Sequence, residues 1–133
     1  MQPELELVKL WVDRARTDLL SAEADLAYKT PIVEDACFHC QQAVEKILKA
    51  FLVFHGVEFE YTHQIERLIE QCVRLNPSFA RLHDTADQLT VYAVRFRYPY
   101  TGPLPTLDHV RRLLSIAQET CNFVFDRLPR ELR

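Results

Sequence analysis

The residues best suited to chemistry in this 133-residue chain lie in the segment RFRYPY at positions 95–100, where two arginines alternate with aromatic side chains. A guanidinium can bind a phosphate through two parallel hydrogen bonds, and an aromatic ring can stack on a nucleobase. We therefore predict a nucleotide- or RNA-binding role for four of these side chains, namely Arg95, Arg97, Tyr98 and Tyr100. The alternative is a helix end at which the arginines lay their aliphatic stems over apolar surface and keep their charged heads in water.

A second group of polar side chains follows one edge of the segment 33–56, at positions Gln41, Gln42, Glu45, Lys46 and Lys49. Helical spacing places them beside a wide apolar stripe on the same helix. These residues either line a polar groove or form an ordinary solvated helix face, and the sequence favours neither interpretation.

The chain has four cysteines, and the pair Cys37 and Cys40 has the C-x-x-C spacing of redox and zinc sites. Both fall on the apolar stripe of one predicted helix, and Cys72 and Cys121 are isolated in the sequence. We therefore interpret all four as core thiols and expect no bound metal. The alternative is a zinc site, which would need one of the isolated cysteines or a histidine to converge with the pair.

Several classes of enzyme need motifs that this sequence lacks. It has no G-x-S-x-G, Walker A or G-x-G-x-x-G motif, and two glycines cannot build a loop that cradles phosphate. Its five histidines are scattered, and none belongs to an H-E-x-x-H motif. These absences argue against a serine hydrolase, a P-loop NTPase and a dinucleotide-dependent dehydrogenase, and we expect no cofactor.

Five amphipathic helices must position these residues, and the three/four spacing of apolar side chains predicts each of them. The helices span residues 3–28, 33–56, 62–76, 78–96 and 106–128. The predicted N-terminal caps are Thr30, Thr62, Ser78 and Thr106. Gly56 is expected to end the second helix. Short connections between long helices favour antiparallel neighbours, so we predict an all-α, antiparallel up-and-down bundle of four to five helices that forms a single domain over residues 1–133.

The charges are distributed unevenly along the chain, whose net charge is −3. Residues 1–66 contain 6 basic and 12 acidic side chains, whereas residues 67–133 contain 10 arginines and 7 acidic side chains. An arginine-rich half suits a phosphate-bearing partner, although solvated helix surfaces would have the same composition. The N-terminus lacks the basic start and apolar run of a signal peptide, and no run is long enough to span a membrane. We therefore expect a cytoplasmic protein.

Three motifs together resemble the HEPN domain family of prokaryotes. The run QQAVEKILKA at residues 41–50 is similar to a family signature, His63 with Ile65 and Leu68 is similar to its H-x-L/I-x-x-L element, and RYP at residues 97–99 resembles a sequence found in one subgroup. The resemblance covers nearly the whole chain. It implies a helical bundle that dimerises and that is often paired with a minimal nucleotidyltransferase in a toxin–antitoxin system. On this basis Gln42, Lys46 and His63 complete the predicted nucleotide- or RNA-binding set.

The resemblance also implies an activity from which this sequence departs. Many HEPN proteins are metal-independent RNases that use an arginine followed four to six residues later by a histidine. No arginine of this chain has a histidine at that spacing. We therefore predict a HEPN protein that acts by association, as a homodimer that binds a nucleotidyltransferase partner. The alternative is an RNase toxin in which Arg95 or Arg97 works with a spatially close histidine such as His63 or His39.

Large apolar side chains near the helix ends provide a physical reason to expect a dimer. They exceed what one narrow seam between helices is expected to bury, and a self-complementary patch on two copies would cover them. The side chains that suggest this patch are Trp11, Phe38, Phe51 and Phe54.

Overall fold

The computed structural model of the protein describes residues 4–59, 61–62, 64–95 and 102–132, with side chains in the fourth helix through residue 90. The five main helices are α1 (Leu5–Ala27), α2 (Val33–Phe54), α3 (Ile65–Leu75), α4 (His83–Arg95) and α5 (Leu107–Phe125). Two short 3₁₀ helices are added, η1 (Pro77–Leu82) and η2 (Arg130–Leu132). No strand occurs among the described residues, which confirms the predicted all-α bundle. None of the described helices has both the length and the apolar character needed to cross a membrane.

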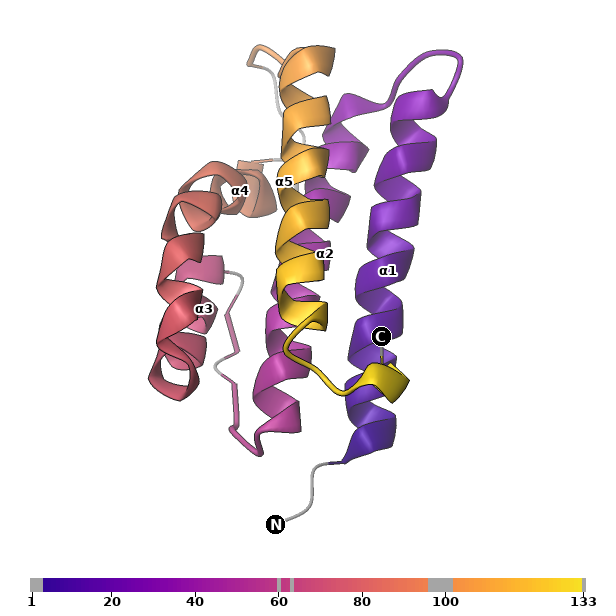
Figure 1. The fold of residues 1–133 in the computed structure, drawn as a ribbon. Coiled ribbons are helices and arrows are strands. Elements are labelled where there is room, and N and C mark those ends of the chain that lie inside the picture. The colour runs from indigo at the N-terminus through magenta and orange to yellow at the C-terminus, as the bar shows by residue number, and fades with distance from the viewer. Residues whose placement is uncertain (1–3, 60, 63, 96–101, 133) are drawn as a thin grey trace.

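Helix α2 lies at the centre of the fold. It packs against α1, α3, α4 and α5, and α1 and α2 form an antiparallel hairpin joined by a short turn (Figure 1). Helices α3 and α4 lie together on the side of α2 that is away from α1 (Figure 1). Among the described helices, α1 and α2 form the most extensive contact.

Gly56 ends α2, as predicted, because the chain there needs a positive φ angle of 69° that glycine adopts at no steric cost. The backbone N–H of Val57 donates to the carbonyl of Leu52 at 2.9 Å, and that of Gly56 donates to Val53 at 3.0 Å. This pair of hydrogen bonds is a Schellman motif, and it satisfies carbonyls that the helix leaves unpaired.

The structure confirms one of the four predicted N-terminal caps and differs from the prediction at the other three. The Thr106 hydroxyl accepts from the His109 backbone at 3.1 Å, which confirms this cap of α5. The Thr62 hydroxyl accepts from the Gln64 backbone at 3.0 Å, but Gln64 holds the cap position and α3 begins only at Ile65. The prediction of Thr30 is wrong, because Ile32 precedes α2 and no side chain caps that helix.

The predicted fourth helix also starts differently from the prediction. The side chain of Asn76, not Ser78, accepts the capping hydrogen bond, and Pro77 occupies the first helical position. The segment from Pro77 then forms a 3₁₀ helix, and the α-helical geometry begins at His83. Proline at the first turn is compatible with either helix type, so the sequence alone did not distinguish them.

All four cysteines are buried free thiols, which confirms their interpretation as core residues. The thiols of Cys72 and Cys121 lie 3.9 Å from the backbone carbonyls of Leu48 and Ala43. Burial raises the pKa of each of the four thiols to about 12. They therefore remain protonated at neutral pH and act as small packing residues.

The expected dimer patch of large apolar side chains is wrong for Phe51 and stays a prediction for the other three residues, which are partly exposed. Phe51 is only 2% exposed and lies inside the core of its own chain. Trp11 and Phe54 are half-buried against the same core, and Phe38 lines a surface groove described below. A five-helix bundle with a central helix buries more aromatic surface than a single seam would, so Phe51 gives no argument for a dimer.

Candidate functional site

A cluster of charged side chains lies along the α1–α2 seam, and we call it the α1–α2 polar cluster. Its members are Asp18, Asp25, Asp35, His39 and Lys46. The two α1 residues are seven positions apart and therefore share a helix face, and the α2 residues follow a similar three/four spacing. The antiparallel hairpin brings the two faces together.

Asp18 anchors this cluster. Asp18 is only 6% exposed. Its two carboxylate oxygens accept hydrogen bonds from His39 Nδ1 at 2.7 Å and from Lys46 Nζ at 2.6 Å. Both partners come from α2, so one buried carboxylate fixes two side chains of the neighbouring helix. Hydrogen bonds to an ionised carboxylate are stronger than neutral ones, and this geometry fixes the orientation of the imidazole ring.

The second nitrogen of His39 faces another carboxylate. Its Nε2 atom lies 3.3 Å from Asp35 Oδ2, one helical turn away on α2. An ionised carboxylate only accepts hydrogen bonds, so Asp18 fixes Nδ1 as the donor nitrogen and leaves Nε2 facing Asp35. In this arrangement both ring nitrogens of His39 face carboxylates of the same cluster.

Asp25 and Asp35 form a close carboxyl pair at the end of the seam. The pKa of Asp25 is raised to about 6, first because burial disfavours the charged form and then because of the neighbouring Asp35 carboxyl group; His39 opposes the shift. The Oδ2 atom of Asp25 is shielded from solvent, and no donor of the described residues forms a hydrogen bond with it. A buried carboxylate oxygen without a donor is uncommon in folded proteins.

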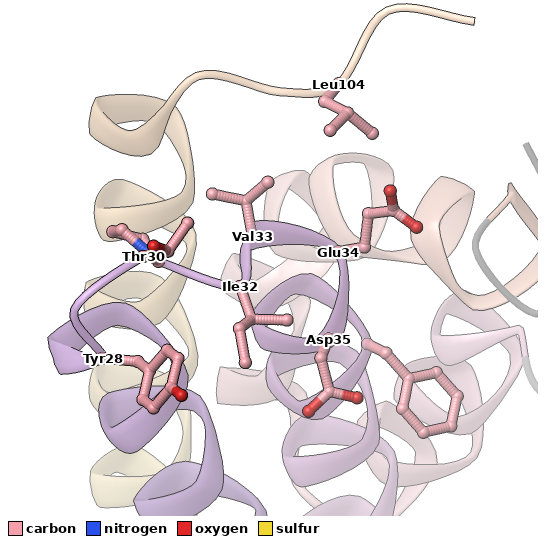
Figure 2. Close-up of a pocket in the computed structure, with 9 residues that line it drawn as sticks. Tyr28, Thr30, Ile32, Val33, Glu34, Asp35 and Leu104 are labelled. Carbon is pink, nitrogen blue, oxygen red and sulfur yellow. The ribbon is translucent and has the colours of Figure 1, made fainter. Parts of the chain in front are cut away.

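A surface groove of about 830 Å³ adjoins this cluster at the α1–α2 turn. It is lined by Tyr28, Thr30, Pro31, Ile32, Val33, Glu34, Asp35, Phe38 and Leu104. Figure 2 shows Ile32 between Tyr28 and Asp35, with Leu104 reaching over from the segment that leads into α5. Three large apolar side chains are well exposed there, Tyr28 at 62%, Leu104 at 50% and Ile32 at 45%. The charged residues described in its lining are both acidic, so the groove combines an apolar floor with a negative rim.

A second polar row lies buried on α2, where the sequence suggested a groove or a solvated face. Gln41, Glu45 and Lys49 are 0%, 3% and 8% exposed, so both interpretations are wrong for these three residues. Glu45 accepts from Gln41 Nε2 at 3.2 Å and from Lys49 Nζ at 3.1 Å. The Lys49 ammonium also lies 5.5 Å from the Trp11 ring centre and 5.0 Å from that of Phe59. The row is a buried structural network closed by aromatic rings.

The structure places only part of the predicted nucleotide- or RNA-binding set. Gln42 and Lys46 lie on one face of α2, but Gln42 donates to Gln41 Oε1 at 2.7 Å and Lys46 is paired with Asp18. Arg95 is the last residue of α4. The other members, Arg97, Tyr98, Tyr100 and His63, lie outside the described residues. The binding role of the set stays a prediction.

Sequence reasoning missed the three aspartates of the polar cluster. Asp18 and Asp25 each follow an apolar stripe residue, Ala15 and Ala22, by three positions. Residues three apart lie on one side of a helix, so two aspartates at heptad spacing beside the stripe were a usable signal. Their partners on α2 could not be identified without the register of the hairpin.

The fold and the site together define a class of protein: an all-α bundle whose central helix carries a buried polar row on one side and a carboxylate–histidine cluster on another. The family model of the HEPN domain matches residues 8–128 of the sequence. The chain therefore belongs to the HEPN domain family.

Two solved structures are similar over nearly the whole chain. TT1696 from Thermus thermophilus is 26% identical with a TM-score of 0.74, and the match covers 91% of this chain and 98% of that one. ST0689, an archaeal HEPN homologue, is 27% identical with a TM-score of 0.73, and the match covers 90% of this chain and 96% of that one. No curated protein has a matching sequence.

Proposed function

We propose that this HEPN-domain chain works by association, as a homodimer that binds a minimal nucleotidyltransferase partner and a nucleotide or RNA, and that it does not cleave RNA. The observation that carries the proposal is the groove at the α1–α2 turn. Exposed apolar patches that are rimmed by polar groups mark sites of protein association. Tyr28, Ile32 and Leu104 form such a patch within this groove.

The charge of the groove indicates which kind of partner it suits. Glu34 and Asp35 lie on its rim, and no lysine or arginine of the described residues lines it. This negative rim would repel a phosphate backbone, and it would also repel a second copy of itself. Complementary charge at an interface favours specific association. We therefore assign the groove to a segment of the nucleotidyltransferase that carries apolar and basic side chains, and we assign nucleotide or RNA binding to the arginine-rich segment 95–100.

The arrangement of His39 argues against the RNase alternative. A general base must have a nitrogen that can approach the attacking hydroxyl. Both ring nitrogens of His39 face carboxylates instead, Asp18 at 2.7 Å and Asp35 at 3.3 Å. Together with the absence of a histidine four to six residues after any arginine, this favours a protein that acts without cleavage.

Light scattering after size exclusion tests the association. The chain of 15.6 kDa is expected to run alone at twice that mass, and to form a larger complex when co-expressed with a minimal nucleotidyltransferase encoded beside it. Ile32→Glu should abolish the complex and leave the homodimer intact, because it places a charge in the apolar floor. Leu75→Glu, at the end of α3, is the matched control and should change neither, since Leu75 is similarly exposed at 39% but lies away from the groove.

Three results would overturn this part of the proposal. They are a monomeric chain, a complex that survives Ile32→Glu, and an Ile32→Glu chain that loses the homodimer, which would place the second copy in the groove.

An RNA-cleavage assay tests the absence of catalysis. Labelled single-stranded RNA incubated with the pure protein is expected to remain intact, and to bind the wild-type protein more tightly than Arg97→Ala. A loss of one phosphate contact weakens binding and lowers its dependence on salt. Cleavage that disappears in Arg97→Ala would establish the RNase alternative instead.

A further inference from the structure

We propose that Asp25, Asp35 and His39 form a binding site for a divalent transition-metal ion, contrary to the expectation from the sequence. Each residue offers one ligand atom, and these atoms all lie within 4.8 Å of one another. Two carboxylates and one imidazole suit manganese, iron or zinc, because imidazole is a good ligand for iron and zinc and carboxylate oxygens suit manganese. All three residues come from the α1–α2 hairpin of a single chain.

The orientation of His39 is the first argument for this site. A histidine that binds a metal almost always donates its other ring N–H to a carboxylate, which fixes the ring and its tautomer. Asp18 does this here, since its carboxylate accepts from Nδ1 at 2.7 Å. The remaining nitrogen, Nε2, then points toward Asp35, whose Oδ2 lies 3.3 Å away. A metal ion bound at this point would take Nε2 and the Asp35 carboxylate as ligands at once.

The support behind the ring is itself built into the fold. Asp18 is 6% exposed, and Lys46 Nζ holds its second oxygen at 2.6 Å. The ammonium thus balances the charge of the supporting carboxylate. A chance group of acidic side chains on a helix surface would have no such buried support.

The second argument is the buried oxygen of Asp25. Its Oδ2 atom is removed from solvent, and no N–H or O–H donor of the described residues forms a hydrogen bond with it. Leaving a buried acceptor unsatisfied costs the desolvation penalty of that group. A cation bound between the two carboxyl groups and His39 would satisfy this atom.

The site also has an entrance. The Asp35 side chain is 51% exposed and lines the groove, and the His39 side chain is 22% exposed. An ion could therefore enter from the groove and keep water in its remaining coordination positions. The site needs neither a second copy nor a partner protein, so its test is independent of the proposed association.

Manganese titration of tag-free protein, after removal of metals with a chelator, tests the site. Bound manganese loses the six-line electron paramagnetic resonance signal of the free ion, and manganese does not favour thiols. We expect one equivalent to bind, zinc to displace it and magnesium to compete weakly, because magnesium prefers oxygen ligands and imidazole does not suit it. Asp35→Asn and His39→Gln should each weaken binding at least tenfold. Asp13→Asn, an exposed change of the same charge on α1, should leave it unaltered.

Circular dichroism of each variant shows whether it is folded, and the exposed Asp35→Asn change decides the test if His39→Gln fails to fold. The proposal is overturned if the wild-type protein binds no stoichiometric manganese, or if Asp35→Asn binds it equally well. Equal affinity for manganese and magnesium would also overturn it, since that result would indicate a non-specific acidic surface.

Discussion

Replacing Glu45 with alanine is expected to lower the free energy of unfolding by about 3–5 kcal/mol, because breaking a buried ion pair leaves one charge without compensation. Glu45 is 3% exposed and accepts hydrogen bonds from Gln41 and Lys49. Without it, the Lys49 ammonium would keep, among the described residues, the faces of Trp11 and Phe59 as its nearest partners. Urea denaturation followed by circular dichroism measures the change.

Two further variants identify the cause. Glu70→Ala removes an exposed carboxylate from α3 and should change stability by less than about 0.5 kcal/mol. The double variant Glu45→Leu with Lys49→Met replaces both charges by apolar groups of similar size and should recover most of the lost stability. If Glu45→Ala costs no more than Glu70→Ala, or if the double variant is less stable than Glu45→Ala, the pair is not the buried network that we describe.

The helices were predictable because their evidence is local. The apolar spacing of each segment, the positive φ angle available to Gly56 and the hydroxyl of Thr106 all act within one or two helical turns. The start of the fourth helix was not predictable in the same way. Asn76 and Ser78 are both good caps, and only the hydrogen bond from the Ser78 backbone to the Asn76 side chain shows which of them was used.

The polar row on α2, formed by Gln41, Glu45 and Lys49, is buried, and this burial was not predicted for a different reason. Helical periodicity shows which residues share a face, but it does not show how many neighbours cover the helix. Lys49 is buried because Trp11 of α1 and Phe59 of the segment after α2 both approach it. Since α2 also contacts α3, α4 and α5, little of its surface remains for solvent. A central helix in a bundle can therefore bury polar residues that would be exposed on a peripheral helix with the same sequence.

The polar cluster depended on the register of the hairpin. His39 meets Asp18 across 21 residues of sequence, and Lys46 meets the same carboxylate across 28. A shift of one helical turn between α1 and α2 would pair His39 with other residues. The motif that identified the family, QQAVEKILKA, contains Lys46 but none of the aspartates, so family membership could be inferred from the sequence while the cluster could not.

Replacing Phe79 with alanine is the second change with a large expected effect, a loss of about 3–5 kcal/mol in the free energy of unfolding. Phe79 is fully buried, and its ring centre lies 4.4 Å from that of Phe51 and 5.1 Å from that of Phe123. Phe79 therefore packs η1 against both α2 and α5. Its removal would leave a cavity between these three elements, and the surrounding structure could not easily close it. Thermal and urea denaturation should both report the loss.

The controls separate the cavity from the chemistry of the ring. Phe79→Leu retains part of the volume and should cost clearly less than Phe79→Ala, because the loss grows with the size of the cavity left behind. Tyr61→Ala removes an aromatic ring that is 93% exposed and should have little effect. If Phe79→Ala costs less than about 1.5 kcal/mol, the site has relaxed around the missing ring. Helix η1 would then be only loosely packed. The contact of Phe79 with Phe51 and Phe123 would not be what holds α3 and α4 against the rest of the bundle.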